Sequence, residues 1–450
     1  MRDRNHCAFR MSALAAVGGL AVLTLLLPAG CVSSHTSAAS NPTPAQQYLD
    51  FALSVCDHTE RQLPEITRVA EVVAQRYING GMIGFFWGVA NVGNGLEEEL
   101  WGRSGQIMHV SFERCWKPNR TDAEKANDVV IAGWTRDPNP KDLPRLQEFK
   151  NRKCYIIGFG PRGLPSLAEQ MKLCDVWFDT GYGTNDRAVK FSDSFEAGHG
   201  NLLSNVLNAW ALMGETIAAL TRHGKMPPMA KSFSYADGHE WWDKYFRKQQ
   251  FHDDYQVPPI LAGKLGRAYV DQIRGLLQKY GRTQLPVVNR DADWIVEELG
   301  KGRKTVVASM GHMPWAYAGK AEAEAWAIPT YLEGSANRYI KATPDGALVL
   351  RLGYSGDHRD DEAALKQKHQ RVMLICAENP RPEWQLPQDL LSVIDMGWAF
   401  GDACVSIPGY PIRILPPSGV MQLVAYETVN VEVLGRIHRG DGSVLNATGR

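Results

Sequence analysis

Short apolar runs recur along the chain, and a stretch with helical spacing follows most of them. In the first half these runs occupy residues 82–90, 128–134, 153–160 and 174–181. The second half repeats the order at 305–311, 347–356, 372–380 and 403–409. Continuous apolar runs that alternate with helical segments are typical of parallel strands whose faces are both covered by crossover helices. The pattern predicts one α/β plan that occurs twice.

Amphipathic segments strengthen the duplication. A helical pattern precedes the first strand of each half, at 63–81 and 261–280, and another closes each half, at 201–220 and 416–436. Residues 232–259 between the halves are too rich in aromatic side chains for a free linker. We therefore expect a first domain at 46–225, an ordered connector at 226–262, a second domain at 263–440 and a tail at 441–450.

The N-terminus has the pattern of an export signal. Three arginines precede an apolar run at 11–27, and small residues then lead to Cys31. This order is similar to the lipobox of bacterial lipoproteins, which implies lipidation of Cys31; a plain cleaved signal or an uncleaved anchor are the alternatives. We expect a signal peptide at 1–30, a flexible tether at 31–45 and a location in the cell envelope, anchored to the membrane.

Composition narrows the choice of partner. The chain of 450 residues has 49 basic and 49 acidic side chains and no long block of like charge, so nucleic acid is not an expected partner. Its eight cysteines show no zinc spacing and mostly suit buried thiols. No dinucleotide or Walker motif is present. We expect no metal and no cofactor.

Ligands of open parallel sheets bind beyond the carboxyl ends of the strands. Polar, aromatic and glycine residues follow the predicted strands at these ends. In the first half they are Trp87, Gly88, Asn91, Trp134, Thr135 and Arg136. In the second half they are Trp315, Tyr354, Ser355, Gly356 and Ser418. We expect these residues to bind the ligand, although aromatic side chains at such positions equally often belong to the core.

Three segments of the chain resemble the sugar isomerase (SIS) domain. The resemblance is to two consecutive copies of this domain, which together cover most of the chain. The three segments are the run DVVIAGWTRDPNP, the GYSG turn after an apolar strand, and the late segment PPSGVMQLVAYETVNVEVLGR. The resemblance implies two three-layer α/β/α domains, each with a five-stranded parallel sheet in flavodoxin-like order, that pack as a pseudo-two-fold pair. It also implies a carbohydrate derivative as ligand, near the interface of the two copies.

The phosphate loop of that family departs from its usual pattern here. The family has a loop rich in Ser and Thr, whereas this chain has Trp134, Thr135, Arg136 and then Pro138, which lacks an N–H donor. Asp357 follows the second copy's Ser355-Gly356. We therefore expect an unphosphorylated sugar to be a plausible ligand, its ring covered by tryptophan.

Aldose–ketose isomerisation needs a group that moves a proton between adjacent carbons and one that opens the ring. The candidates are Glu97 and Glu98, in a run that continues with Glu99, together with His199 and His312. Each candidate also has a structural explanation. Acidic residues at the start of a helix are stabilised by the helix dipole, and His199 between two glycines could simply belong to a turn. We expect the protein to bind a carbohydrate derivative, either as an isomerase or as a non-catalytic sensor. A structural scaffold is the third alternative. The sequence leaves open whether the protein forms a homodimer.

Overall fold

The computed structural model describes residues 41–85, 96–112, 116–183, 185–310, 325–332, 345–354, 371–377 and 389–438, without the side chains of 97, 98, 309, 310 and 329–332. The chain divides into Met1–Asn41 and a compact unit, Pro42–Arg450. No helix that the structure describes is both long enough and apolar enough to cross a membrane.

The first sheet is parallel and has the order β1-β2-β3-β4 among the residues described. Its strands are β1 (Ile83–Phe85), β2 (Val129–Gly133), β3 (Tyr155–Gly160) and β4 (Val176–Asp179). Each lies inside one of the four predicted apolar runs. Four strands, and not the expected five, are seen in the described part of this half.

The second sheet is parallel and five-stranded, with the order β11-β10-β9-β7-β8. Its strands are β7 (Thr305–Met310), β8 (Ala327–Leu332), β9 (Leu348–Leu352), β10 (Arg371–Cys376) and β11 (Leu391–Asp395). Counted along the chain from β7, this is the order 2-1-3-4-5, so the expected flavodoxin-like order is confirmed for this half. The described strands of the first sheet, β1-β2-β3-β4, correspond to strands 1-3-4-5 of this order.

One strand expectation is wrong. Residues 403–409 form no strand; Val405 makes a single antiparallel bridge with Ile414, and the last strand of the sheet is β11. Ala403, Val405 and Ile407 are buried, which explains the apolar run, but this stretch does not pair as a strand of either sheet. Asp402 and Gly409 both have positive φ, at 49° and 77°, and interrupt any ladder on either side.

Helices cover both faces of the first sheet. Ile131 and Ile157 point into the core shared with α1 (Pro44–Ile78) and α6 (Asn201–Arg222). Val130 and Ile156 point to the opposite face, into a cluster with side chains of α4 (Asp142–Asn151). On that same face α5 (Ala168–Leu173) follows the short helix η2 (Pro165–Leu167). The expected three-layer arrangement is present here.

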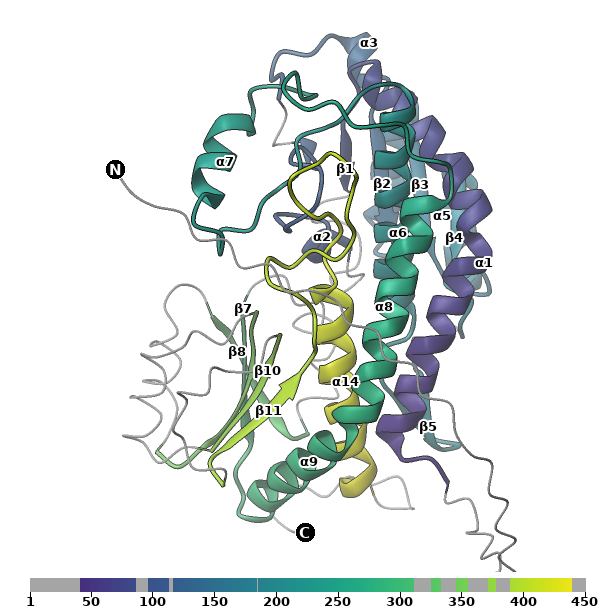
Figure 1. The fold of residues 1–450 in the computed structure, drawn as a ribbon. Helices are drawn as coiled ribbons and strands as arrows, with labels where there is room; N and C mark the ends of the chain where they lie inside the picture. Colours follow the sequence, from purple (N-terminus) through teal and green to yellow (C-terminus); the bar gives the residue numbers. More distant parts are fainter. Residues whose placement is uncertain are drawn as a thin grey trace, which may run out of the picture. The chain divides into compact units, whose positions relative to one another are not determined.

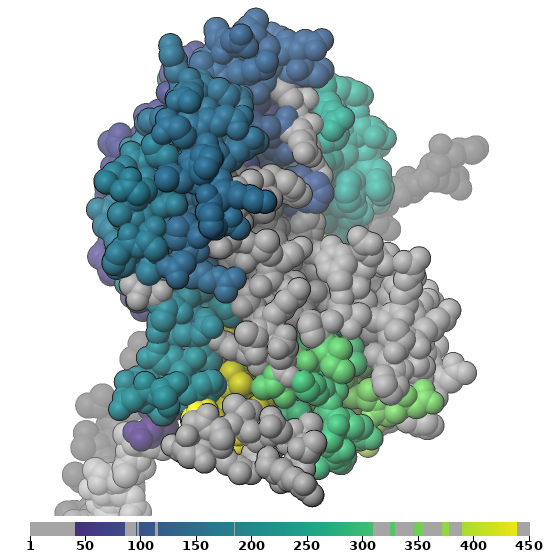
Figure 2. Space-filling view, turned by 180° about the vertical axis from the view of Figure 1, so that it is seen from behind, coloured from purple at the N-terminus to yellow at the C-terminus, as the bar shows by residue number. Residues whose placement is uncertain are grey.

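The helices of the two halves pack against one another. α8 (Lys264–Thr283) contacts α1 and α6, while α14 (Ser418–Ile437) contacts α1 and α9 (Leu285–Gly300). α9 and α14 also lie on the second sheet. Figure 1 shows α14 between the second sheet and the helices α1 and α8. Figure 2 shows the rear face, where described residues of the first half, in blue and teal, and of the second half, in green, both reach the surface.

Corresponding elements of the two halves keep a nearly constant spacing. β1 and β7 begin 222 positions apart, β2 and β9 219, β3 and β10 216, and β4 and β11 215. The closing helices α6 and α14 begin 217 positions apart. The duplicated order that the apolar pattern predicts is therefore present in the elements themselves.

Shorter elements complete the described chain. These are α2 (Leu96–Glu99), α3 (Asp122–Lys125), the antiparallel pair β5 (Val189–Ser192) and β6 (Phe195–Ala197), and α7 (Gly238–Tyr245). α7 belongs to the segment between the halves. There the Trp241 indole donates to the carbonyl of Met229 at 2.8 Å, and His252 Nε2 lies 2.9 Å from the hydroxyl of Tyr410. Cys56, Cys154, Cys174 and Cys404 form no disulfide.

Buried carboxylates from distant positions cap the long helices. α6, α8 and α14 begin after Gly200, Gly263 and Pro417, which supply no side-chain cap. The first N–H groups of a helix need acceptors, and a negative charge there is favoured by the helix dipole. The acceptors are Glu432 for α1, Asp186 for α6, Glu215 for α8 and Asp402 for α14.

Candidate functional site

A buried polar group lies where the carboxyl edge of the second sheet meets the first half. Its members are contributed by the end of α2 and the residues after it, by the residues after β9 and by the start of α14. We call it the α14 group, and it consists of Glu99, Arg103, Tyr354, Asp402 and Ser418. The expected location, a strand edge formed by both halves, is therefore occupied by charged side chains.

Glu99 is fully buried beside the N-terminus of α14. Its carboxylate pairs with the guanidinium of Arg103 and accepts from the Trp210 indole at 3.2 Å. A Cβ at Gly419 would lie 2.0 Å from this carboxyl group, so only glycine permits the approach. Burial raises the pKa of Glu99 to about 7, against the opposing charge of Arg103. A carboxyl group poised near neutral pH can both take up and release a proton.

Arg103 links Glu99 to the second half. The pair is spaced i, i+4, which brings the two side chains to the same side of the chain. The guanidinium also donates to the hydroxyl of Tyr354 and lies 5.7 Å from the centre of its ring. Tyr354 follows β9 by two residues, at the carboxyl edge of the second sheet; its ligand-binding role stays a prediction.

Asp402 and Ser418 complete the group. The Ser418 hydroxyl and backbone N–H donate to the two carboxylate oxygens of Asp402, at 2.8 and 3.2 Å. Burial raises the pKa of Asp402 to about 6, and the charge of Arg103 opposes this rise. Carboxyl groups with strongly raised pKa values are concentrated at functional sites.

A second buried group lies at the start of α6. We call it the α6 group, and it consists of Asp186, His199, Glu427 and Asn430. His199 Nδ1 donates to Glu427 Oε1 at 2.6 Å, because a carboxylate can only accept, and Asn430 donates to the other oxygen at 3.0 Å. The two groups are separated along α14: eight residues between Gly419 and Glu427 correspond to about 12 Å. The structure thus pairs His199 with Glu427 of the second half.

The residues after β2 are partly core and partly surface. Trp134 is fully buried; its ring stacks on Trp177 with 5.3 Å between centroids, and its N–H donates to Asp142 at 2.8 Å. In this position the indole has no exposed face for a sugar ring. The Thr135 carbonyl accepts from Asn201 at 3.1 Å, whereas Arg136 is exposed.

Several predicted site residues lie outside the part of the chain that the structure describes. For Glu97 and Glu98 only the backbone is described, in α2. Outside the described residues lie Cys31, Trp87, Gly88, Asn91, His312, Trp315, Ser355 and Gly356. Their proposed roles remain predictions from the sequence.

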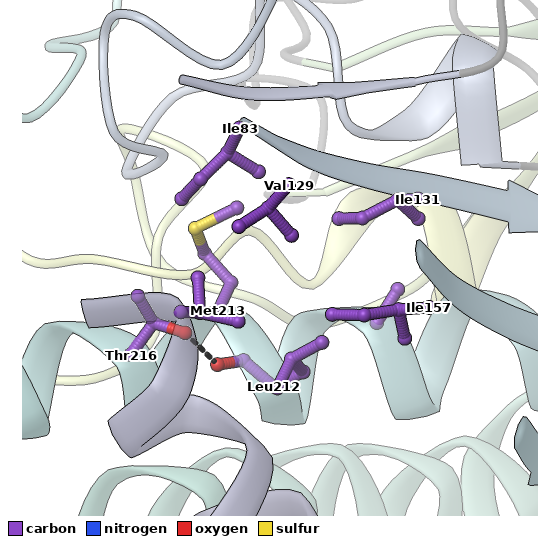
Figure 3. A pocket seen from close by; sticks show the side chains of 9 residues that line it. Ile83, Val129, Ile131, Ile157, Leu212, Met213 and Thr216 are labelled. Carbon is purple, nitrogen blue, oxygen red and sulfur yellow. Dashed lines mark hydrogen bonds between the residues drawn. The ribbon is translucent and has the colours of Figure 1, made fainter. Parts of the chain in front are cut away.

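A cavity in the first half is not a ligand site. It lies between the first sheet and α6, has a volume of about 10 Å³ and is lined by side chains such as Val73, Ile131, Ile157 and Met213 (Figure 3). The one hydroxyl in its lining, that of Thr216, already donates to the Leu212 carbonyl at 2.8 Å. The space is that of about one water molecule, without polar groups to hold it. No cluster of His, Cys, Asp or Glu suited to a metal ion occurs among the described residues.

Sequence reasoning assigned no role to five residues of these groups: Arg103, Asp186, Asp402, Glu427 and Asn430. The spacing of Glu99 and Arg103 is a local signal that points to an ion pair. Asp186 and Asp402 carry no such signal, because each becomes functional only through a helix that starts 15 or 16 positions later.

Comparisons with known proteins concern the fold. No protein-family model matches the chain, and no curated protein matches its sequence. A protein from Salmonella typhimurium LT2 named for sugar binding is 11% identical with a TM-score of 0.49, over 88% of this chain and 99% of that one. The C-terminal domain of glucosamine-fructose-6-phosphate aminotransferase from Francisella tularensis is 10% identical with a TM-score of 0.46, over 84% and 95%. Glucosamine-6-phosphate deaminase from Thermotoga maritima is 8% identical with a TM-score of 0.40, over 87% and 94%. The strand pairing, and not these distant likenesses, establishes the parallel α/β architecture of this chain.

Proposed function

We propose that this protein binds a carbohydrate derivative at the α14 group and isomerises it. The observation that carries the proposal is Glu99, a buried carboxyl group with a pKa of about 7 at the carboxyl edge of a parallel sheet. Its neighbours come from both halves of the chain, which agrees with the site that the SIS resemblance implies. The proposed domains, 46–225 and 263–440, each contribute one side of this site.

The chemistry follows from the three side chains. The Glu99 carboxylate removes a proton from the carbon next to the sugar's carbonyl and returns it to the former carbonyl carbon, while the hydroxyl proton on the first of these carbons moves to the former carbonyl oxygen. The enediolate that forms between these steps carries negative charge, and Arg103 is the adjacent cation that stabilises it. The Tyr354 hydroxyl, held by Arg103, orients the guanidinium. His199 is bonded to Glu427, which lies about 12 Å further along α14 than Gly419, so His199 is assigned no step in this reaction.

A non-catalytic role is the second candidate, and two observations favour it. Glu99 and Arg103 have exposures of only 0% and 2%, and the Trp134 indole is packed inside the protein. A pair so deeply buried equally suits a structural element that joins the halves. In that case the protein is an envelope sensor or a scaffold that uses the duplicated fold.

Isotope exchange separates these functions. The full chain is incubated in D₂O with aldoses and amino sugars, and loss of the proton signal next to the carbonyl is followed by NMR. We expect exchange with wild type, loss of exchange in Glu99→Gln, and full exchange in Glu169→Gln, a matched change at a glutamate that is 62% exposed. Binding without exchange supports the sensor, and neither binding nor exchange supports the scaffold.

We also propose that the protein is a membrane-anchored envelope lipoprotein. The support is the order of arginines, apolar run and small residues before Cys31. Metabolic labelling with a fatty acid in a bacterial host should mark wild type and not Cys31→Ser. Labelling of both proteins, or of neither, removes this proposal. The soluble part could in addition form a homodimer, which size-exclusion chromatography with light scattering would detect.

A further inference from the structure

Two helix starts at the carboxyl edges of the two sheets, those of α6 and α14, are filled by Asp186 and Asp402 of the chain itself. A third aspartate, Asp142, is the first residue of α4 and accepts from the N–H of Asn139, just before that helix. In parallel α/β proteins such helix starts are the usual places for the phosphate of a ligand, because backbone N–H groups and the helix dipole both favour an anion.

Asp186 and Asp402 hold equivalent places in the two halves. They lie 216 positions apart, close to the 217 that separates α6 from α14. Asp186 accepts from the N–H groups of Gly200 and Asn201 at 3.1 and 2.6 Å, and Asp402 accepts from that of Ser418 at 3.2 Å. Both have positive φ, 56° and 49°, a conformation that residues other than glycine rarely adopt. Both halves thus keep a strained, buried aspartate at the same position.

These two helix starts face the ligand edges. Asn201, the first residue of α6, bonds to the Thr135 carbonyl after β2 and to the Thr180 hydroxyl after β4. Gln422, on the first turns of α14, donates to the Gly353 carbonyl after β9 at 2.8 Å. The aspartates therefore stand at the positions that a bound phosphate would take.

Asp142 occupies the third position, at the loop after β2. It is fully buried and accepts from the Asn139 N–H at 3.0 Å and from the Trp134 indole. This is the loop that resembles the phosphate loop of the SIS family. Pro138 in the same loop has no N–H, and that of Asn139 is already bonded to the carboxylate.

A phosphate at any of these three places would meet a carboxylate. Phosphate monoesters carry about −1.5 to −2 charges at neutral pH, and like charges side by side in a buried site repel one another strongly. At the second sheet the α14 group itself contains two carboxyl groups for one guanidinium. Such a site accepts a neutral sugar or the ammonium group of an amino sugar far better than an anion.

We propose that Asp142, Asp186 and Asp402 determine specificity by excluding phosphorylated sugars, so that the ligand is a neutral or amino sugar. This inference rests on the proposed sugar binding. Arg136 is a cation that would favour a phosphate near this edge of the first sheet. It is exposed after β2 and makes no ion pair with a described residue. Its position at the surface leaves its charge screened by water and salt.

Matched sugars with and without phosphate test the inference on the full chain. We expect glucosamine and N-acetylglucosamine to raise the melting temperature, and glucosamine 6-phosphate and inorganic phosphate to leave it unchanged. Asp402→Asn keeps a residue that tolerates positive φ and should bind glucosamine 6-phosphate at least about tenfold more tightly than wild type does. Asp193→Asn, the same change at a fully exposed side chain, should not.

The results separate this inference from the proposed function. If glucosamine 6-phosphate stabilises wild type as strongly as glucosamine does, sugar binding stands and the exclusion of phosphate is overturned. Loss of that response in Arg136→Gln would then locate the anion site at Arg136. If Asp402→Asn melts as wild type does and gains no affinity, Asp402 does not set specificity. If no sugar changes the melting temperature, the proposed binding is overturned, and the inference with it.

Discussion

The α14 group and the α6 group occupy equivalent places but contain different chemistry. Glu427 is the tenth residue of α14 and contacts the start of α6, and Trp210 is the tenth residue of α6 and contacts Glu99 at the start of α14. One group holds a carboxyl–guanidinium pair, whereas the other holds a carboxyl–imidazole pair. The duplicated frame thus fixes where polar side chains gather, and individual substitutions decide what they can do.

The largest expected effect is the loss of the anionic partner in the α14 group. Glu99→Ala removes the carboxylate that pairs with Arg103 and leaves the guanidinium buried without this partner. We therefore expect the free energy of unfolding to fall by about 3–5 kcal/mol. Urea unfolding measures this. The double variant Glu99→Leu/Arg103→Met removes both charges and should recover most of the loss. A loss below about 1 kcal/mol in Glu99→Ala would mean that the pair is not buried as described.

The α14 group should also make the stability of the protein depend on pH. The folded-state pKa of Glu99, about 7, lies above its ordinary value of 4.5, so the folded protein holds this proton more tightly than the unfolded chain does. The resulting stabilisation is complete below pH 4.5 and is lost as the pH rises to about 7. Asp402, with a pKa of about 6 against 3.8, acts in the same direction.

We therefore expect unfolding free energies to fall by roughly 4 kcal/mol between pH 5 and pH 8 through these two groups, with more than half of the fall from Glu99. Glu99→Gln cannot ionise, and its curve should be flatter over this interval than that of wild type. Equal slopes for the two proteins would show that Glu99 does not titrate there.

In the α6 group the corresponding loss should be smaller. Glu427→Ala removes the acceptor of His199 Nδ1 and of the Asn430 amide, but it leaves no guanidinium without its carboxylate. We expect the free energy of unfolding to fall by about 1–3 kcal/mol. Glu427→Gln keeps an oxygen for the imidazole N–H and should lose less. A loss as large as that of Glu99→Ala would remove the difference between the two groups.

The sequence predicted the strands with continuous apolar runs and missed those with a weaker signal. β8 contains Pro329, which argues against a central strand, and it lies at the edge of the sheet where proline is tolerated. β11 alternates buried and half-buried residues and is also an edge strand. Residues 403–409 imitate a strand because loop side chains are buried there for another reason, the contact with the 414 region.

For the site, the sequence indicated the edge and part of its chemistry. The glutamate run, Tyr354 and Ser418 were found because they follow predicted strands or begin a predicted helix. Asp402 was not found, since its role depends on a positive φ and on a helix 16 positions away. Trp134 was given a ligand role because its position after β2 says nothing about Trp177, which lies 43 positions further on and covers its ring.

The smallest expected effect concerns Trp134. Trp134→Phe keeps an aromatic ring against Trp177 but removes the N–H that donates to Asp142, so stability should fall by about 1 kcal/mol. Sugar affinity, measured by calorimetry, should stay within about twofold of wild type, because no face of the indole is exposed. Trp177→Phe is the matched variant on the other side of the stack and should likewise leave affinity unchanged. If Trp134→Phe instead weakened sugar binding tenfold at unchanged stability, the indole would contact the ligand, and its burial beside Asp142 would describe only the unliganded protein.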